Sequence, residues 1–468
     1  MQKRIDSLVE AYTRGVIRWR WGVLLLSLLV AVAAAGGGRN LVFDSDYRTF
    51  FGADNPQLLT FEAVQNIYAK NDNVLFVLKP DHGDAMAPDV LEAMDRITKA
   101  AWKLPFATRV DSINNFQHTH AQEDDLTVED LVKDPARLDD AGREAARAVA
   151  TAEPLLAGRL IARDSNAAGV NVTFTLPHKA LDETPRAITA ARALADEIRA
   201  DYPHITVALT GMVVMNATFE EAGMNDMTNL IPLMYGVLIL AMVLFLRSPW
   251  GTLGTVLVIG LSAATAMGLA GWLGIRLTPP SATAPTIILT LAIADSVHIL
   301  VVLFAAMRRG ETRRDAIVYS MRVNFGPVFL TSLTTVIGFL SLNASDAPPF
   351  HDLGNITAMG VTAAWVFSVA FLPALMAVTP LRVKVRLGGD GPSGFMDRWA
   401  EFVLARRRVL LWGTAVFVVA LGALIPRIQL DDQFVQYFTP NIPFRADTDY
   451  AEKHLTGAYT LEYSIGSG

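Results

Sequence analysis

Cysteine is absent from all 468 residues, and charged residues are scarce, at 18% of the chain. Without cysteine the chain has no disulfide framework, no thiolate metal site and no cysteine nucleophile. The sequence also lacks a glycine-rich nucleotide-binding loop, a recognisable spacing of metal ligands and a Ser-His-acid arrangement. We therefore expect no enzyme, no cofactor, no bound metal and no nucleic-acid partner.

Hydrophobic residues make up 52% of the chain, and they gather in long apolar runs. About 20 apolar residues in a helix, rising ~1.5 Å each, are long enough to cross a ~30 Å hydrocarbon layer. We expect seven spans; the alternative for the first is a cleaved secretory signal, because Ala33 to Ala35 resemble a cleavage site. The predicted spans are 22–38, 229–246, 251–274, 285–307, 325–342, 354–378 and 408–426.

The fourth predicted span places Asp295 and His298 near its middle. An ionised carboxylate there costs about 2.5 to 3.5 kcal/mol on insertion scales, so such residues usually face a bundle interior and have a partner. Residues three apart share a helix face, whereas Ser296 lies about 100° round from Asp295. We expect a proton pathway; the alternatives are a polar contact between helices for Asp295 and a packing role for His298.

Two neighbouring spans carry related patterns. In the fifth, Thr331, Thr334 and Thr335 share one face at about the depth of Asp295. Their hydroxyls are expected either to donate to that carboxylate, to hold a water between it and His298, or to bond back to their own helix. In the third, small residues recur every four positions, which predicts close helix packing. These small residues are Gly260, Ala264 and Gly268.

Residues 40–225 have the pattern of a water-soluble α+β domain with a charged helical insertion at about 127–150. Without the insertion, the order of elements is β-α-β-β-α-β, the split ferredoxin-like arrangement. The expected strands are 74–78, 108–113, a hairpin of 159–164 with 170–176, and 205–211; the expected helices are 88–102 and 181–202.

Arg247 follows the second span, and arginine and lysine gather in the loops after the fourth and sixth spans, whereas the loops between these hold only Arg276 or only Asp346, His351 and Asp352. By the positive-inside rule, the basic loops and the amino terminus are cytoplasmic. The α+β domain is therefore expected on the outside of the membrane.

The last part of the sequence repeats the first at an offset of about 387 residues. The seventh span corresponds to the first, and the segment around 461–465 corresponds to the strand at 74–78. Internal repeats are the usual build of secondary transporters, so we expect one complete repeat and the opening of a second. The matched positions are Asp44 with Asp431, Phe51 with Phe438 and Pro56 with Pro443.

This order of one span, a large external domain and five spans, begun again, resembles the RND superfamily of proton-driven exporters. Residues 293–300 and 326–342 resemble its MmpL-like branch, which is related to hopanoid exporters and to sterol-sensing proteins of the Patched type. The resemblance implies that Asp295 belongs to a proton relay completed by the tenth span, and that the substrate is a lipid or another hydrophobic molecule. Members of this branch often carry Tyr after that Asp, where this chain has Ser296.

We expect a multi-pass helical protein of the bacterial inner membrane that works as a proton antiporter. Burial favours the protonated carboxyl, so Asp295 would accept a proton outside and release it inside. Each proton brings about 2.3 kcal/mol per 100 mV of membrane potential. The alternatives are an accessory of protein translocation like SecD and SecF, and a lipid or sterol sensor without a transport cycle.

The predicted spans and the predicted external domain divide the chain into six parts. They are an amino-terminal segment with the first span (1–39), the external domain (40–225), spans two to six (226–380), a cytoplasmic linker (381–407), the seventh span (408–426) and the start of a second external domain (427–468). The expected partners are a hydrophobic substrate, protons, the rest of a second half, and a further copy of the chain or a periplasmic protein. We do not expect these 468 residues to transport by themselves.

Overall fold

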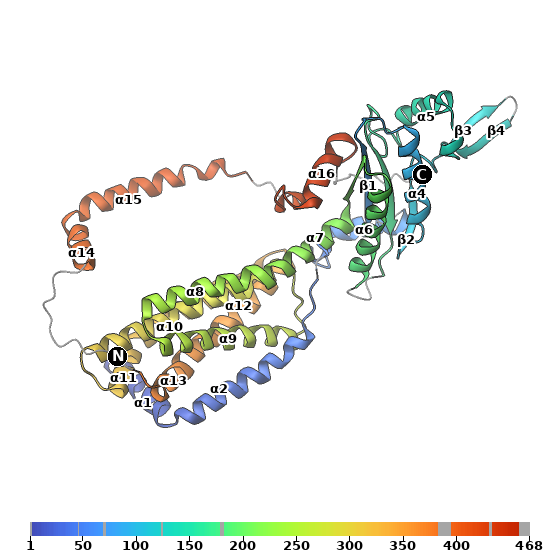
Figure 1. Cartoon of the computed structure of the whole chain (residues 1–468). Coiled ribbons are helices and arrows are strands. Elements are labelled where there is room, and N and C mark those ends of the chain that lie inside the picture. The colour runs from blue at the N-terminus through green and yellow to red at the C-terminus, as the bar shows by residue number, and fades with distance from the viewer. Residues whose placement is uncertain are drawn as a thin grey trace.

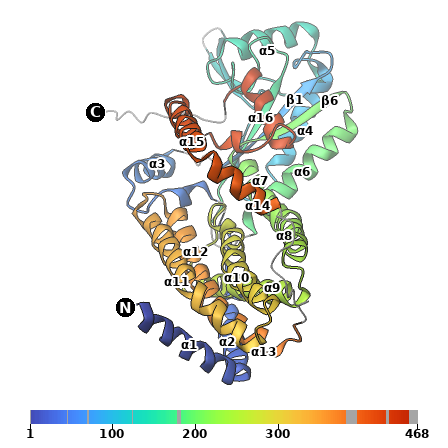
Figure 2. The same cartoon turned by 90° about the vertical axis from the view of Figure 1, so that its left-hand side faces the viewer.

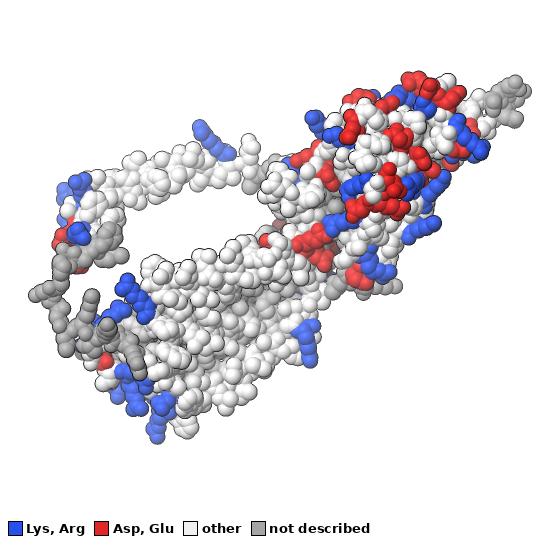
Figure 3. Space-filling model, viewed as in Figure 1, with Lys and Arg blue, Asp and Glu red and all other residues white. Residues whose placement is uncertain are grey.

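The computed structural model describes residues 2–44, 46–68, 72–122, 125–177, 182–381, 395–429 and 433–457. A bundle of long helices is joined to a smaller part that contains the β-sheets (Figure 1). In the face shown in Figure 3, acidic and basic side chains cover the sheet-containing part, basic ones mark the far end of the bundle, and the helices between are almost uncharged. This distribution is typical of a protein that crosses a membrane.

Seven helical segments of the described chain are long and apolar enough to span a membrane, which confirms the multi-pass prediction. The second span continues without interruption from the sheet-containing part, through a π-helical turn at Asp226–Leu230. The segments are Arg20–Asn40 (α2, Arg20–Ala35), Met212–Leu246 (α7, Met212–Asn225, and α8, Ile231–Leu246), α9 (Pro249–Trp272), Ser281–Arg308 (α10, Ala284–Arg308), Arg313–Ala344 (α11, Arg313–Leu340), Pro348–Val378 (α12, Pro348–Val366, and α13, Leu372–Val378) and Arg407–Arg427 (α15, Arg407–Gly422).

Capping residues fix where the spans begin. The Ser248 side chain accepts the Gly251 amide at the start of α9, and Thr312 accepts the Asp315 amide at the start of α11. Proline stands in the first turn of α9, α10 and α12, where its missing N–H would have no helical partner in any case. The short loops between spans are therefore encoded locally.

The four-stranded sheet has the order β2-β5-β1-β6, and all neighbouring strands are antiparallel. With α4 after β1 and α6 after β5, this is the split ferredoxin-like order that the sequence predicted. Phe76 of β1 packs into the core under α4 and α6, while Val77 faces the other side, with Ala451 of α16. The elements are β1 (Asn73–Pro80), α4 (Pro88–Ala101), β2 (Ala107–Asp111), β5 (Ala168–Phe174), α6 (Glu183–Asp201), β6 (Ile205–Thr210) and α16 (Pro443–His454).

Two parts of the predicted α+β pattern are wrong. The segment 159–164 is not a strand, because Ile161 makes only isolated bridges to Ala157 and Ala168. The segment 127–150 is not one helix. Its beginning belongs to β4 (Asp125–Asp130), which pairs with β3 (Gln117–Gln122), and α5 (Asp140–Ala152) follows, capped by Asp139. The β-branched Thr127 and Val128 favour a strand over the helix that the charges suggested.

The internal repeat is visible as matching elements. The helix α15 lies 387 positions after α2 at both ends, and α16 lies 387 positions after α3 at both ends. The short turn η9 (Phe434–Tyr437) likewise matches η2 (Tyr47–Phe50). Asp431 and the predicted strand at 461–465 lie outside the described residues. The helix α3 comprises Pro56–Ile67. The helices before the two matching spans, α1 (Gln2–Arg18) and α14 (Phe395–Ala405), also end 387 positions apart.

Candidate functional site

The helix α10 runs through the middle of the bundle and contacts α8, α9, α11 and α12 (Figure 2). Residues that recur every three or four positions along it are buried, and Asp295 falls within this buried stripe between Ala292 and Ile299. The helical period of the sequence therefore directs the carboxylate into the bundle. Only 7% of the Asp295 surface is exposed.

Asp295 is bonded to the neighbouring span. The Ser332 hydroxyl of α11 donates to Asp295 Oδ2 at 3.0 Å, and Ser332 is itself buried. A hydroxyl is a neutral partner that can donate to an ionised carboxylate and can accept from a protonated one. The contact can therefore persist through a change in the charge of Asp295.

Ser296 points to a different span from its neighbour Asp295. Its hydroxyl lies 3.5 Å from that of Ser368, and both side chains are fully buried. Ser368 belongs to the π-helical segment Phe367–Phe371, which joins α12 to α13. Such π-turns inside helices are frequent at functional sites. The two adjacent polar residues of α10 thus connect it to the fifth and the sixth spans.

His298 lies one turn further along α10 and is exposed, as Ala294 is. This face of α10 is not covered by the described part of the chain. The structure therefore separates His298 from the buried contact between Asp295 and Ser332, although both side chains arise from adjacent turns.

The three threonines of the fifth span bond to their own helix. Thr331 donates to the carbonyls of Pro327 and Val328, and Thr335 donates to the carbonyl of Thr331. Thr334 also donates to backbone carbonyls of the preceding turn. The partner that reaches Asp295 is Ser332, which the sequence analysis missed although it stands directly after Thr331. Position 332 lies about 100° round from Thr331, on the buried face of α11.

Only one member of the small-residue stripe in α9 makes the close contact predicted. A Cβ atom at Gly268 would collide with the backbone of Ala34 in α2, whereas one at Gly260 meets no described atom within 4 Å. Ala264 is exposed. A step of four residues turns about 40° beyond a full turn, so the stripe drifts off the packed face. Gly271, which lies against Gly37, completes the contact in place of Gly260.

A cavity of about 820 Å³ lies between α1, α2, α9, α11 and α12. Its walls are mostly apolar, and its volume is within the ~300–1,000 Å³ usual for small-molecule sites. Val336 lines it one helical turn after Ser332, and Phe367 lines it directly before Ser368. The partners of Asp295 and Ser296 therefore belong to the helices that form the cavity wall.

This chain is similar to proteins of an archaeon and of two mycobacteria. A membrane protein of Methanocaldococcus jannaschii is 27% identical over 193 residues, which are 40% of this chain and 49% of that protein. The transport protein MmpL12 of Mycobacterium tuberculosis is 25% identical over 288 residues, or 60% of this chain and 25% of that protein. MmpL10 of Mycobacterium leprae, also a transport protein, is 26% identical over 48% of this chain and 23% of its own length.

This chain thus aligns with about half of the archaeal relative and about a quarter of each mycobacterial one. The model of the MMPL family matches residues 83–410, which include part of the sheet-containing domain and spans two to six. That match covers more than two thirds of the sequence and all of the helices around Asp295, and on this ground the chain belongs to the MMPL family.

Proposed function

We propose that this chain is part of a proton-driven transporter that moves a lipid or another hydrophobic molecule from or across the inner membrane. The observation that carries the proposal is Asp295, a carboxylate buried in a spanning helix and bonded to Ser332 of the next span. Acidic residues inside membranes are expensive, and they usually mark ion or proton pathways. The names of the mycobacterial relatives as transport proteins support the same class.

The coupling step follows from the hydrogen bond. An ionised Asp295 accepts a strong, charge-assisted hydrogen bond from the Ser332 hydroxyl, whereas a protonated carboxyl makes a weaker, neutral hydrogen bond. Protonation therefore changes how firmly α10 and α11 are held together. Because Val336 lines the cavity one turn away on α11, this change is passed to the cavity wall. Uptake of a proton on one side and its release on the other would drive a cycle of opening and closing.

The substrate class follows from the cavity. Its lining is largely aliphatic, with a few polar groups that include Ser27, Asn355 and Thr362. An acyl chain or a similarly apolar body fits such walls, and the scattered polar groups can orient a headgroup. Protons and this hydrophobic molecule are the proposed partners.

Further proposals concern the surroundings of the bundle. The basic loops lie on the cytoplasmic side and the sheet-containing domain lies in the periplasm. No residue of α15 is buried against the described chain, and His298 is exposed. A second repeat is the proposed partner of these surfaces, because α15 and α16 reproduce α2 and α3. Further copies of the protein or a periplasmic component would complete the assembly.

The proposal is tested with Asp295→Asn, which keeps the shape of the side chain but cannot ionise. We expect inverted membrane vesicles that contain the protein expressed from its own gene to couple proton flux to movement of a fluorescent phospholipid. A pH-sensitive dye and the labelled lipid report the two fluxes separately. The variant should lose both almost completely, because no carboxylate remains to bind and release the proton.

The matched control is Asp346→Asn, which changes an acid between the fifth and sixth spans. It should retain both fluxes. If Asp295→Asn transports as well as the wild type, the proton-coupled mechanism is wrong, and a lipid sensor without a transport cycle becomes the better explanation.

A further inference from the structure

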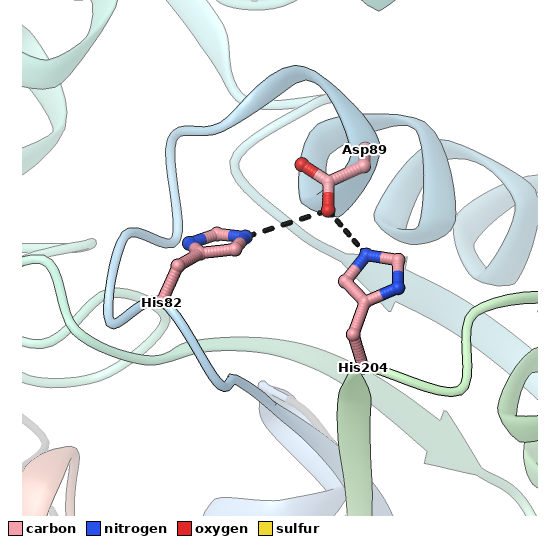
Figure 4. A group of neighbouring side chains, drawn as sticks. All are labelled: His82, Asp89 and His204. Atoms are coloured by element: carbon pink, nitrogen blue, oxygen red, sulfur yellow. Dashed lines mark hydrogen bonds and ion pairs between the residues drawn. The ribbon is translucent and has the colours of Figure 1, made fainter.

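Three side chains with metal-binding atoms meet at one end of the four-stranded sheet. Asp89 Oδ2 lies 3.4 Å from His82 Nε2 and 2.5 Å from His204 Nε2 (Figure 4). One potential ligand atom from each residue lies within 4.8 Å of the other two. The cluster plays no part in the mechanism proposed for the membrane spans.

The backbone around the cluster is ordered by the sheet. Pro80, at the end of β1, pairs with Ile205 at the start of β6, and the Asp81 amide donates to the His204 carbonyl at 3.0 Å. His82 and His204 therefore leave the same end of the β1-β6 ladder. Asp89 enters from the first turn of α4, which begins at Pro88. Three segments far apart in sequence are thus held at fixed positions around one point.

The donor set selects a class of metal. Two imidazole nitrogens and one carboxylate oxygen suit Zn²⁺ and similar transition ions, whereas Ca²⁺ and Mg²⁺ prefer oxygen ligands alone. In a tetrahedral zinc site with bonds of about 2.0–2.2 Å, ligand atoms stand roughly 3.3–3.5 Å apart. The separation of Asp89 Oδ2 from His82 Nε2 already matches this spacing, and His204 needs only a small outward movement.

We propose that His82, Asp89 and His204 form a Zn²⁺-binding site on the sheet-containing domain, with water in the remaining coordination position. All three side chains are reachable from solvent, being 41%, 33% and 44% exposed respectively. A bound ion would connect the turn after β1, the first turn of α4 and the start of β6. The site would therefore stabilise this end of the domain and leave one position open for an exchangeable ligand.

The ring proton of His82 has to move when the metal binds. His82 Nδ1 now lies 3.3 Å from the Asp84 amide, whose N–H it accepts, so Nε2 carries the proton. A metal at Nε2 places the proton of the neutral ring on Nδ1, and the weak contact to Asp84 is then lost. Binding also requires an unprotonated nitrogen on both histidines, so protons compete with zinc for the site.

The site is tested by equilibrium dialysis of the purified full chain in detergent against zinc chloride. We expect one tightly held Zn²⁺ per chain, and at least a tenfold loss of affinity in Asp89→Asn and in His204→Gln. The matched control replaces two other histidines of the same domain, His118 and His120, which stack on β3 outside the cluster. The double variant His118→Gln/His120→Gln should bind zinc like the wild type.

A second readout uses the absence of cysteine. With Co²⁺ as the probe, His204→Cys should give the intense absorption of a cobalt–thiolate bond, and His118→Cys should not. Equal zinc binding by the wild type and Asp89→Asn, or the same cobalt–thiolate band in both cysteine variants, would overturn the proposal. In either case the cluster would be a pair of His–Asp hydrogen bonds without a metal.

Discussion

At the scale of single residues, the most informative contact is that of Asp295 with Ser332. We expect Ser332→Ala to reduce proton-coupled transport roughly 10- to 100-fold, because a hydrogen bond to a charged group contributes about 1.5–3 kcal/mol. Thr331→Val is the matched control, since within the described segments the Thr331 hydroxyl donates to the Pro327 and Val328 carbonyls of its own helix. Vesicle assays of both variants measure the difference. An equal effect of the two changes would remove Ser332 from the pathway.

The sequence predicted the acid but not its partner. An isolated Asp in a long apolar run is informative by itself because its cost is high whatever surrounds it. The choice between Thr331 and Ser332 depended on the rotation of α11 about its own axis, which α10 and α12 determine through packing. A helical wheel anchored on the buried Val328 would have favoured Ser332, because residues four apart share a face.

At the scale of the elements, α9 and α2 approach so closely that only glycine fits at Gly268. We expect Gly268→Ala to destabilise the bundle by roughly 1–3 kcal/mol, the usual cost of overpacking. Gly260→Ala, on the same helix, should be neutral or stabilising by up to ~1 kcal/mol, because alanine favours a helix and the added Cβ contacts nothing described. Thermal unfolding in detergent measures both changes.

The close approach of α9 to α2 is tested by comparing the unfolding temperatures of Gly268→Ala and Gly260→Ala. If both substitutions shift the unfolding temperature in the same direction, the close approach of α9 to α2 is not the reason for Gly268. Alanine also favours the helix over glycine by about 1 kcal/mol, but this gain is too small to offset a collision of the new Cβ at position 268 with the backbone of Ala34.

Element types were easier to predict than their contacts. The apolar runs defined all seven spans, and short strands with intervening helices defined the ferredoxin-like order. The errors fall where the local signal was weak: the hairpin of β3 and β4 is polar, and 159–164 is held by turns. The cluster of His82, Asp89 and His204 could not be predicted, because 115 residues separate Asp89 from His204 and only the β1-β6 pairing brings them together.

At the scale of the whole molecule, a helix of the second repeat covers the sheet of the first. The Asp447 carboxylate of α16 accepts the Leu209 amide at 2.9 Å, and the Thr448 and Thr210 hydroxyls lie 2.6 Å apart. β6 is the edge strand of its sheet, so α16 occupies an otherwise free hydrogen-bonding position. The two copies of the repeated sequence therefore contact each other, because α16, which follows α15, packs on the sheet of the first domain.

This contact should depend on pH. Burial raises the pKa of the Asp447 carboxyl above its usual 3.8, against the smaller lowering effects of the Leu209 amide and Arg199. The docked state therefore binds the proton more tightly than the undocked one, so docking becomes stronger as the pH falls toward the raised pKa and weaker as the pH rises through it.

We expect the β6 amides to gain hydrogen-exchange protection as the pH is lowered from 7 through the raised pKa of Asp447, after correction for the intrinsic exchange rate. Asp447→Asn keeps an oxygen that can accept from the Leu209 amide but has no charge to desolvate, so its protection should be at least as high at pH 7 and should change little with pH. Asp449→Asn, on the exposed side of α16, should keep the wild-type dependence of this protection on pH. If the protection of the β6 amides still changes with pH in Asp447→Asn, another group controls the docking of the second repeat on the first.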